Sequence, residues 1–397
     1  MKSKGTIAIL TGGGDVPGLN PAIRAITIRA LREGYRVLGI RGGWAGLVDM
    51  LPDIEVENSD QVIDLSEDLV NRVGRTGGTF LHTSRTKPSA LPRHLVPDHL
   101  ADTYAEETND LTPAVLKNLE YLEIDYLIPI GGDDTLGYAQ RLHEEGVRIV
   151  AIPKTMDNDV PGTDYCIGFS TCVTRTLLLT NGLRTSAGSH ERFLVIEVFG
   201  RYAGYTALLP TMAGGAHRCL IPEHPFDPEL LCELMVYDRT RNPSRYSVAL
   251  VSEGARMVNE KEMSFQGEET DQYGHKKLGG IGDKVTAALK ELSPKFNDGR
   301  QIEIINQRLG YLVRSGEPDA LDSIVPMAFG NIALDLVLGG GFGRLVSLRN
   351  GVYDSVPLDV VTGQKSKVDI NKFYDTERLR PKYTSFVGNP VFIMSGA

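Results

Sequence analysis

The alternation of short apolar runs with amphipathic segments is the feature that most constrains this fold. Residues 5–10 (GTIAIL) form an apolar run of strand length, and residues 19–32 carry apolar side chains at helical spacing. Residues 36–40 then predict a second strand, and the same order returns over residues 126–152 and 193–221. Because buried strands alternate with helices, we predict the α/β class with parallel sheets.

The length of the chain indicates more than one core. At 397 residues it is too long for a single typical core and suits two medium domains. We predict two Rossmann-like domains with the active site in the cleft between them. The first covers residues 1–165 plus about 316–350, the second covers 166–315, and residues 351–397 form a tail that packs on the domains.

Polar clusters follow most of the predicted strands. In open parallel sheets, ligands bind beyond the carboxyl ends of the strands. Side chains placed there are Asp15, the Asp133–Asp134 pair, the cluster at 154–159, Arg201 and Glu253. We expect these clusters to converge on one cleft.

Composition excludes some classes of function. The chain has 42 basic and 51 acidic residues, a net charge of -9, which argues against general nucleic-acid binding. The four cysteines form no CxxC pair, which is typical of a reducing compartment without a disulfide framework. We see no leader before the first strand and no apolar run near the roughly 20 residues that cross a bilayer. We therefore expect a soluble cytoplasmic protein with neither nucleic-acid nor membrane partners.

The first candidate loop is the glycine-rich turn at residues 11–20 (TGGGDVPGLN). Glycines between a strand and a helix let the backbone approach a phosphate closely. The turn lacks the Gly-Lys-Ser/Thr of a Walker A loop and does not fit GxGxxG. A tight turn without a ligand fits the pattern equally well.

Two acidic loops carry further chemistry. Adjacent carboxylates in GGDDT (131–135) are costly to bury without a cation, and Mg²⁺ held with phosphate oxygens would supply one. The alternative is a pair of acidic residues in the first turn of a helix. The loop PKTMDND (153–159) places a lysine beside carboxylates, which can accept a proton and neutralise phosphate, although an ordinary exposed turn stays open.

Taken in order, these segments resemble the phosphofructokinase family. The turn at 11–20 is similar to its phosphate-binding loop, GGDDT to its metal loop and PKTMDND to its catalytic loop. The other matching segments are GRTGGTFLHTSR (74–85), ERFLVIEVFGR (191–201), SEG (252–254) and GYLVRSGEP (310–318).

The resemblance implies a role for each loop in phosphorylating fructose 6-phosphate at its 1-hydroxyl. Asp157 would be the general base that takes the hydroxyl proton. Thr155 and Asp159 would hold the phosphoryl group and position the base, and Asp133 would hold Mg²⁺ as the cofactor. The physics agrees, because phosphoryl transfer depends on positioning and on cationic stabilisation.

The resemblance also implies which residues bind the two substrates. The donor phosphates would be bound by Gly13, Gly14 and either Arg75 or Arg85. The sugar phosphate would be bound by Thr155, Asp157, Phe199, Gly200, Arg201, Glu253, Tyr311 and Arg314. A neighbouring subunit would lend Arg192, with Arg300 and Arg308 as nearby candidates for a second arginine, so we expect a homodimer or homotetramer.

Two positions bear on the donor. In ATP-using members the positions that match Asp134 and Lys154 are typically glycine, whereas both are charged here. Asp134 would occupy the space of an ATP α-phosphate and repel it, and Lys154 offers a cation to the leaving phosphate. We therefore predict pyrophosphate as the donor and count both residues in the catalytic set.

Three other functions compete with this prediction. The first is an ATP-dependent phosphofructokinase. The second is a non-catalytic sugar-phosphate sensor, which would lack Asp157 or Asp133, yet both are present. The third, a nicotinamide dehydrogenase, would need the GxGxxG motif that the chain lacks. Compared with the family pattern, Phe199 replaces a methionine, Tyr311 a histidine and Ser315 a glycine.

Overall fold

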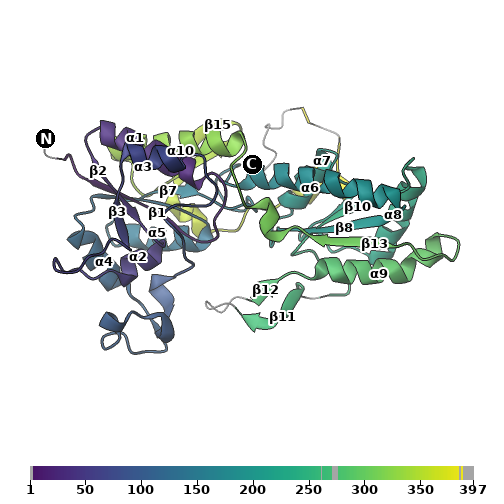
Figure 1. Ribbon diagram of the computed structural model, residues 1–397, viewed down its shortest axis with the longest axis horizontal. Coiled ribbons are helices and arrows are strands. Elements are labelled where there is room, and N and C mark those ends of the chain that lie inside the picture. The colour runs from purple at the N-terminus through teal and green to yellow at the C-terminus, as the bar shows by residue number, and fades with distance from the viewer. Residues whose placement is uncertain (1–2, 261, 271–275, 384–385, 388–397) are drawn as a thin grey trace. The chain divides into compact units, whose positions relative to one another are not determined.

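The chain forms two compact units in a computed structural model that describes residues 3–260, 262–270, 276–383 and 386–387 (Figure 1). Unit 1 comprises Met1–Thr155, Val160–Gly168 and Ser315–Gln364. Unit 2 comprises Met156–Asp159, Phe169–Arg314 and Lys365–Ala397. The end of the predicted tail, residues 388–397, lies outside the described residues.

A seven-stranded sheet forms the centre of unit 1, in the order β15-β14-β7-β6-β1-β2-β3. The strands are β1 (Thr6–Thr11), β2 (Arg36–Ile40), β3 (Val62–Asp64), β6 (Tyr126–Gly131), β7 (Val150–Pro153), β14 (Arg344–Arg349) and β15 (Val352–Pro357). The five inner strands pair in parallel, and every residue of β1 is buried. The predicted parallel-rich α/β class is confirmed.

The two outer strands of this sheet run antiparallel to their neighbours. β3 pairs with β2 and β15 pairs with β14, both antiparallel. The β14–β15 connection has only two residues, Asn350 and Gly351, with φ angles of 51° and 79°. Positive φ at both positions is the geometry of a type I′ hairpin turn, which Asn-Gly strongly favours.

Helices cover both faces of the unit 1 sheet. Figure 1 shows α1, α3 and α10 on one face and α2, α4 and α5 on the other. Their bounds are α1 (Leu19–Arg32), α2 (Trp44–Asp49), α3 (Glu67–Val73), α4 (Thr112–Tyr121), α5 (Asp133–Glu144) and α10 (Leu321–Gly339). The smaller elements are η1 (Pro88–Ala90), β4 (Leu91–Pro92), η2 (Arg93–Leu95), η3 (Asp98–Leu100), β5 (Thr108–Asn109) and η5 (Leu358–Thr362).

Helix α10 is longer and more apolar than any segment predicted from the sequence. Among the described residues it is the one helix that by length and composition could cross a membrane. It packs along α1 and against β7 and β14. This packing is what the core helix of a globular domain requires, and such a helix passes the same length and composition criteria.

Unit 2 is built on a four-stranded, fully parallel sheet in the order β13-β8-β10-β9. Its strands are β8 (Phe193–Val198), β9 (Arg218–Leu220), β10 (Ser247–Ser252) and β13 (Ile304–Arg308). Its helices are α6 (Phe169–Ser189), α7 (Tyr205–Met212), α8 (Pro228–Arg241), α9 (Ile281–Phe296), η4 (Gly310–Val313) and α11 (Ile370–Phe373). Two hairpins complete the unit, β11 (Phe265–Thr270) with β12 (Lys276–Leu278) and β16 (Tyr374–Asp375) with β17 (Arg380–Pro381).

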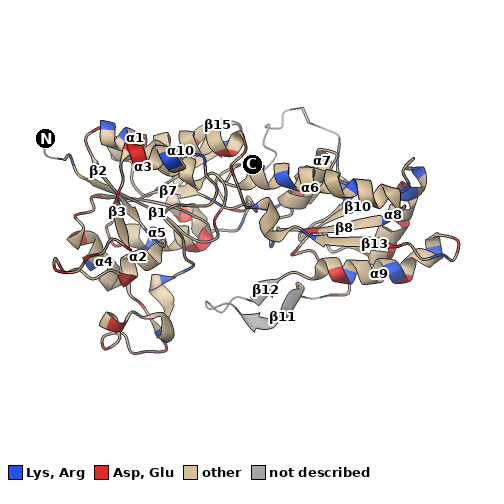
Figure 2. Cartoon of the chain, viewed as in Figure 1, with Lys and Arg blue, Asp and Glu red and all other residues tan. Residues whose placement is uncertain are grey.

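The central strands of the unit 2 sheet are as fully buried as β1 is in unit 1. All six residues of β8 and of β10 are buried, as expected for parallel strands covered on both faces. Helices α6 and α7 pack together, as do α8 and α9. Figure 2 shows basic and acidic residues interspersed over the elements of each unit.

Candidate active site

The carboxyl ends of three neighbouring strands meet in unit 1. The strands β7, β6 and β1 are adjacent in the sheet and end at Pro153, Gly131 and Thr11. The segments that follow them are joined by backbone hydrogen bonds, from Gly12 N to Ile130 O at 3.0 Å and from Lys154 N to Gly131 O at 2.9 Å. The topology therefore gathers the glycine turn, the aspartate pair and Lys154 at one sheet edge.

Gly13 shapes the turn that receives Lys154. Its φ is 79°, its N–H donates to Ser84 O at 2.8 Å, and its carbonyl accepts the Thr83 hydroxyl at 2.7 Å. A Cβ on Gly13 would lie 3.1 Å from the ammonium nitrogen of Lys154, which is 4% exposed. A left-handed backbone turn beside a buried cation is a suitable place for an anion.

Asp133 and Asp134 occupy the first turn of α5 after Gly132, the N-cap. Asp133 is half-buried and Asp134 is exposed. Both residues therefore lie where acidic side chains stabilise the start of a helix. This position is compatible with a metal site, because Mg²⁺ is often held by one carboxylate with phosphate oxygens and water. The described residues hold no cluster of three or more His, Cys, Asp or Glu side chains, so Asp133 would act with ligands from the substrate.

Both candidate donor arginines lie in segments that contact the glycine-rich turn. Arg85 follows Ser84, whose carbonyl accepts the Gly13 N–H, so its backbone lies beside the glycine turn. Arg75 is 73% exposed and lies 3.9 Å from a carboxylate oxygen of Glu317. The turn at 11–20 contacts the segments of both arginines, because Asn20 also donates to the hydroxyl of Thr76, the residue after Arg75, at 2.8 Å.

A second group of predicted residues gathers in unit 2. The carboxyl ends of β8 and β10 are joined from Glu253 N to Val198 O at 2.9 Å and from Gly254 N to Gly200 O at 3.1 Å. Gly200 has a φ of 120°, and a Cβ there would lie 2.8 Å from the carbonyl oxygen of Ala203. Only glycine fits this turn, which carries Arg201 to the edge of the sheet.

Asp157 belongs to the same group. Its carboxylate accepts the backbone N–H of Arg201 at 3.2 Å, and the next residue, Asn158, is buried with a left-handed φ of 55°. Burial, and secondly the Asp159 charge, raises the pKa of Asp157 to about 7, while Arg201 and Lys365 oppose the rise. A carboxylate with its pKa near neutrality suits a general base.

The pKa of Glu253 is shifted by burial and by neighbouring charges, as that of Asp157 is. Burial first, and then the charge of Asp157, raises the pKa of Glu253 to about 8, and Arg201 acts against this. Desolvation and a like charge both disfavour the ionised form. The unit 2 edge is therefore crowded with acidic groups.

Arg314, Phe199 and Tyr311 lie close together. The Arg314 guanidinium carbon is 6.0 Å from the centroid of the Phe199 ring and 5.3 Å from that of Tyr311. Arg314 is buried, whereas Tyr311 is 70% exposed. Phe199 thus supplies a ring face to the arginine at the position where the family pattern has methionine.

Arg192 is not brought to this group within the chain. It precedes β8, whereas Phe199 and Arg201 follow it, so the six residues of the strand separate them by about 20 Å. Arg308 ends β13 and pairs with the buried Glu197 at 2.8 Å and with Asp283 at 3.4 Å.

Two side chains at the unit 2 edge were not predicted from the sequence. Glu197 accepts N–H groups of Gly280 and Gly282 at 3.0 and 2.9 Å and holds Arg308. A charge inside the otherwise apolar run FLVIEV was a signal that could have identified it. The second, Lys365, pairs with Asp159 and carries no comparable local signal.

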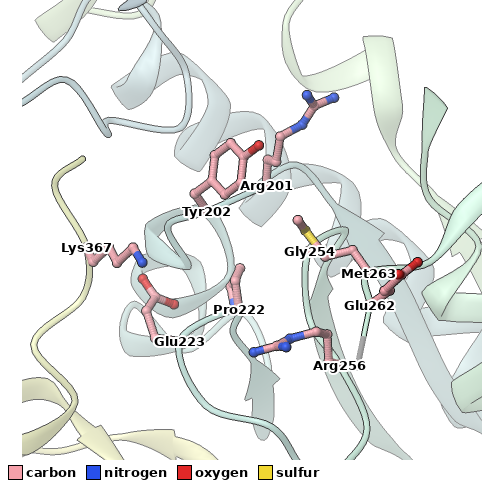
Figure 3. A pocket seen from close by; sticks show the side chains of 9 residues that line it. All are labelled: Arg201, Tyr202, Pro222, Glu223, Gly254, Arg256, Glu262, Met263 and Lys367. Atoms are coloured by element: carbon pink, nitrogen blue, oxygen red, sulfur yellow. The ribbon is translucent and has the colours of Figure 1, made fainter. Parts of the chain in front are cut away.

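A pocket of about 360 Å³ opens beside Arg201 in unit 2. In Figure 3 the Lys367 ammonium points toward the Glu223 carboxylate, so the C-terminal segment forms part of the wall. Its lining residues are Arg201, Tyr202, Pro222, Glu223, Gly254, Arg256, Glu262, Met263 and Lys367.

Comparisons with known proteins place this geometry in context. Residues 6–337 match the phosphofructokinase family. The pyrophosphate–fructose 6-phosphate 1-phosphotransferase of Streptomyces coelicolor is 37% identical over 91% of this chain and 96% of that protein. The ATP-dependent 6-phosphofructokinase 3 of the same organism is 35% identical over the same shares of both chains.

A solved structure is similar in fold. The crystal structure of a pyrophosphate-dependent phosphofructokinase from Marinobacter aquaeolei matches with a TM-score of 0.71 and 20% identity. The match covers 96% of this chain and 89% of that one. At this identity the likeness supports the two Rossmann-like domains and nothing finer.

Proposed function

This chain belongs to the phosphofructokinase family, and we propose that it transfers a phosphoryl group from pyrophosphate to the 1-hydroxyl of fructose 6-phosphate. The family and the phosphotransferase class predicted from the sequence are confirmed. The donor, the site roles and the meeting of the two residue groups in one cleft belong to the proposal.

In the proposed reaction Asp157 accepts the proton of the sugar 1-hydroxyl. The oxygen then attacks one phosphorus of pyrophosphate, the bridging P–O bond breaks, and inorganic phosphate leaves with the bond's electron pair. In the reverse direction protonated Asp157 returns its proton to the leaving sugar oxygen. The raised pKa of Asp157, about 7, supports both roles, because base and acid forms coexist near neutral pH.

The observation that carries the donor assignment is the position of Lys154 against Gly13. A buried ammonium beside the glycine turn offers one fixed positive charge to a small dianionic leaving group. Asp134, exposed in the first turn of α5, would repel an additional phosphate at that edge. The ATP-dependent relative at 35% identity keeps ATP as the alternative donor.

Mg²⁺ would be held by Asp133 together with phosphate oxygens of the donor. A metal so bound would neutralise charge on the transferred group. The other site residues supply binding and orientation: Gly13, Gly14 and either Arg75 or Arg85 at the donor, and Arg201, Glu253 and Arg314 at the sugar phosphate.

We expect the active form to be a cytoplasmic homodimer or homotetramer. Arg192 lies at the opposite end of β8 from Arg201, so it would serve the site of a neighbouring subunit. Two side chains of η4, Tyr311 and Leu312, are 70% and 56% exposed, and an intersubunit contact would cover them.

The deciding experiment measures fructose 1,6-bisphosphate formed from fructose 6-phosphate and Mg²⁺, with pyrophosphate and ATP in parallel. We expect turnover with pyrophosphate and little with ATP. Turnover with ATP alone would keep the family and overturn the donor. Binding of fructose 6-phosphate without turnover from either donor would favour the sensor.

A further inference from the structure

The C-terminal segment, Lys365 to Tyr383, is attached to unit 2 along its length. Ser366 N donates to Asp159 O at 2.9 Å, and Val368 N donates to Glu223 Oε1 at 2.9 Å. The other attachments are Tyr205 OH to Lys367 O at 2.6 Å, Tyr374 OH to Cys219 O at 2.7 Å and Cys219 N to Leu379 O at 2.9 Å. Lys365 is thus placed by tertiary packing at the loop that holds Asp157.

The Lys365 ammonium lies against a carboxylate of that loop. Its nitrogen is 3.1 Å from Asp159 Oδ2 and 4.6 Å from the centroid of the Tyr202 ring. The Asp159 side chain is 7% exposed and that of Lys365 is 34% exposed. A carboxylate that is buried needs a cation or donors to stay ionised, and an aromatic face favours a cation at this place.

The charges around Asp157 are balanced in part by this lysine. Asp159 and Glu253 are acidic groups that act on Asp157, while Arg201 and Lys365 are basic ones. Acidic and basic groups of unit 2 therefore act together on the proposed base. Removal of Lys365 would take away one positive charge that acts on Asp157 and leave the charges of Asp159 and Glu253 in place.

We infer that Lys365 is a positioning residue for the phosphoryl transfer proposed above, which holds Asp159 and keeps Asp157 ionised through its charge. The inference rests on the proposed function, because it assigns a task to a residue outside the family motifs found in the sequence. Lys365 acts through Asp159 and Asp157 and takes no part in the bonds that form and break.

The physical consequence is a defect that depends on pH. A nearby opposite charge lowers a carboxyl pKa, so loss of the ammonium raises the pKa of Asp157 from its value of about 7. With an upward shift of about one unit, the ionised fraction at pH 7 falls about fivefold. Above about pH 9 both enzymes hold Asp157 ionised, and the difference shrinks toward zero.

The test compares Lys365→Met with the parent over about pH 6 to 9.5, using pyrophosphate, fructose 6-phosphate and Mg²⁺. We expect kcat to fall about fivefold at pH 7 with KM for fructose 6-phosphate little changed, and the acid limb of the profile to move upward by about one unit. Lys365→Arg should restore most of the loss. A defect of equal size at every pH, or no defect, would overturn the inference.

Lys382→Met is the matched control in the same segment. The Lys382 ammonium donates to Asn371 O at 2.6 Å, so this variant removes one lysine and one attachment without touching the Asp157 loop. We expect a profile like that of the parent. If Lys382→Met reproduced the Lys365→Met profile, attachment of the segment and not the charge would be responsible.

A readout without turnover separates this inference from the proposed function. In protein labelled with ¹³C at aspartate Cγ, the Asp157 signal is assigned by its absence in Asp157→Asn and titrated in the parent and in Lys365→Met. An upward shift supports the role of Lys365 even if the parent were inactive with both donors, which would sink the proposed function alone. An unchanged titration sinks the inference whatever the activity.

Discussion

The two units place different sets of charged groups at the carboxyl ends of their strands. In unit 1 a glycine turn and the buried ammonium of Lys154 lie at the ends of β1, β6 and β7. In unit 2 the carboxyls of Asp157 and Glu253 lie near the ends of β8 and β10, each with its pKa raised chiefly by burial. One edge suits an incoming anion and the other suits removal of a proton.

This contrast teaches how one type of sheet edge serves two tasks. The backbone turns are alike, since Gly13 and Gly200 both have positive φ where a strand ends. The difference lies in the charged side chains that surround each turn, which come from the turn itself and from distant parts of the chain. In unit 2 these are Arg201 and Lys365, which limit the cost of a crowded acidic edge.

Removing the proposed base from the unit 2 edge should cause the largest loss of activity. We expect Asp157→Ser to lower kcat by about 10²–10⁴-fold, the usual share of a positioned general base. Thermal unfolding should resemble that of the parent, because serine is smaller than aspartate and removes a carboxyl whose ionisation is disfavoured by burial. Near-normal turnover in a folded Asp157→Ser protein would show that Asp157 is not the general base.

The matching change at the other edge is Lys154→Met. We expect kcat with pyrophosphate to fall by roughly 10²-fold, as for loss of one preorganised electrostatic contact. Thermal unfolding of Lys154→Met beside the parent measures what the change costs in stability at a site that is 4% exposed. A large loss of stability with normal kcat would mean that Lys154 is structural.

Asp134→Gly should change which donor the unit 1 edge accepts. We expect the ratio of kcat/KM for pyrophosphate to that for ATP to fall by about tenfold, a change of roughly 1.4 kcal/mol. Glu144→Gly, in the last turn of the same helix, serves as the control, because it also replaces an acidic residue of α5 by glycine but lies at the far end from the site. An unchanged ratio in Asp134→Gly would show that Asp134 does not select the donor.

The smallest effect concerns stability at the acidic edge. Because the folded-state pKa of Asp157 is raised above its unfolded value, its contribution is fully present below about pH 4 and is lost as pH rises through about 7. We expect Asp157→Asn to raise the free energy of unfolding by about 1–2 kcal/mol at pH 8 and by almost nothing at pH 4. Urea unfolding at both pH values measures this, and a gain equal at the two would contradict the pKa assignment.

The sequence by itself determined the elements that depend on near neighbours. An apolar run, a glycine turn and an amphipathic helix are local patterns, so β1, β6 and β8 with their following turns were predicted nearly as they occur. The family followed from motifs within these turns and is confirmed. The Asn350-Gly351 hairpin turn is also encoded locally, because both residues adopt the positive φ angles that Asn-Gly favours.

Only the tertiary structure decided which distant charges meet. Lys365 and Asp159 are 206 residues apart, and no spacing rule links a polar tail to a loop so far upstream. The same holds for Arg308 and the buried Glu197, which the pairing of β13 with β8 brings together. Periodicity reports which face of an element is buried, whereas the partner of a buried charge depends on how the elements pack, and here that packing sets the ionisation of the proposed base.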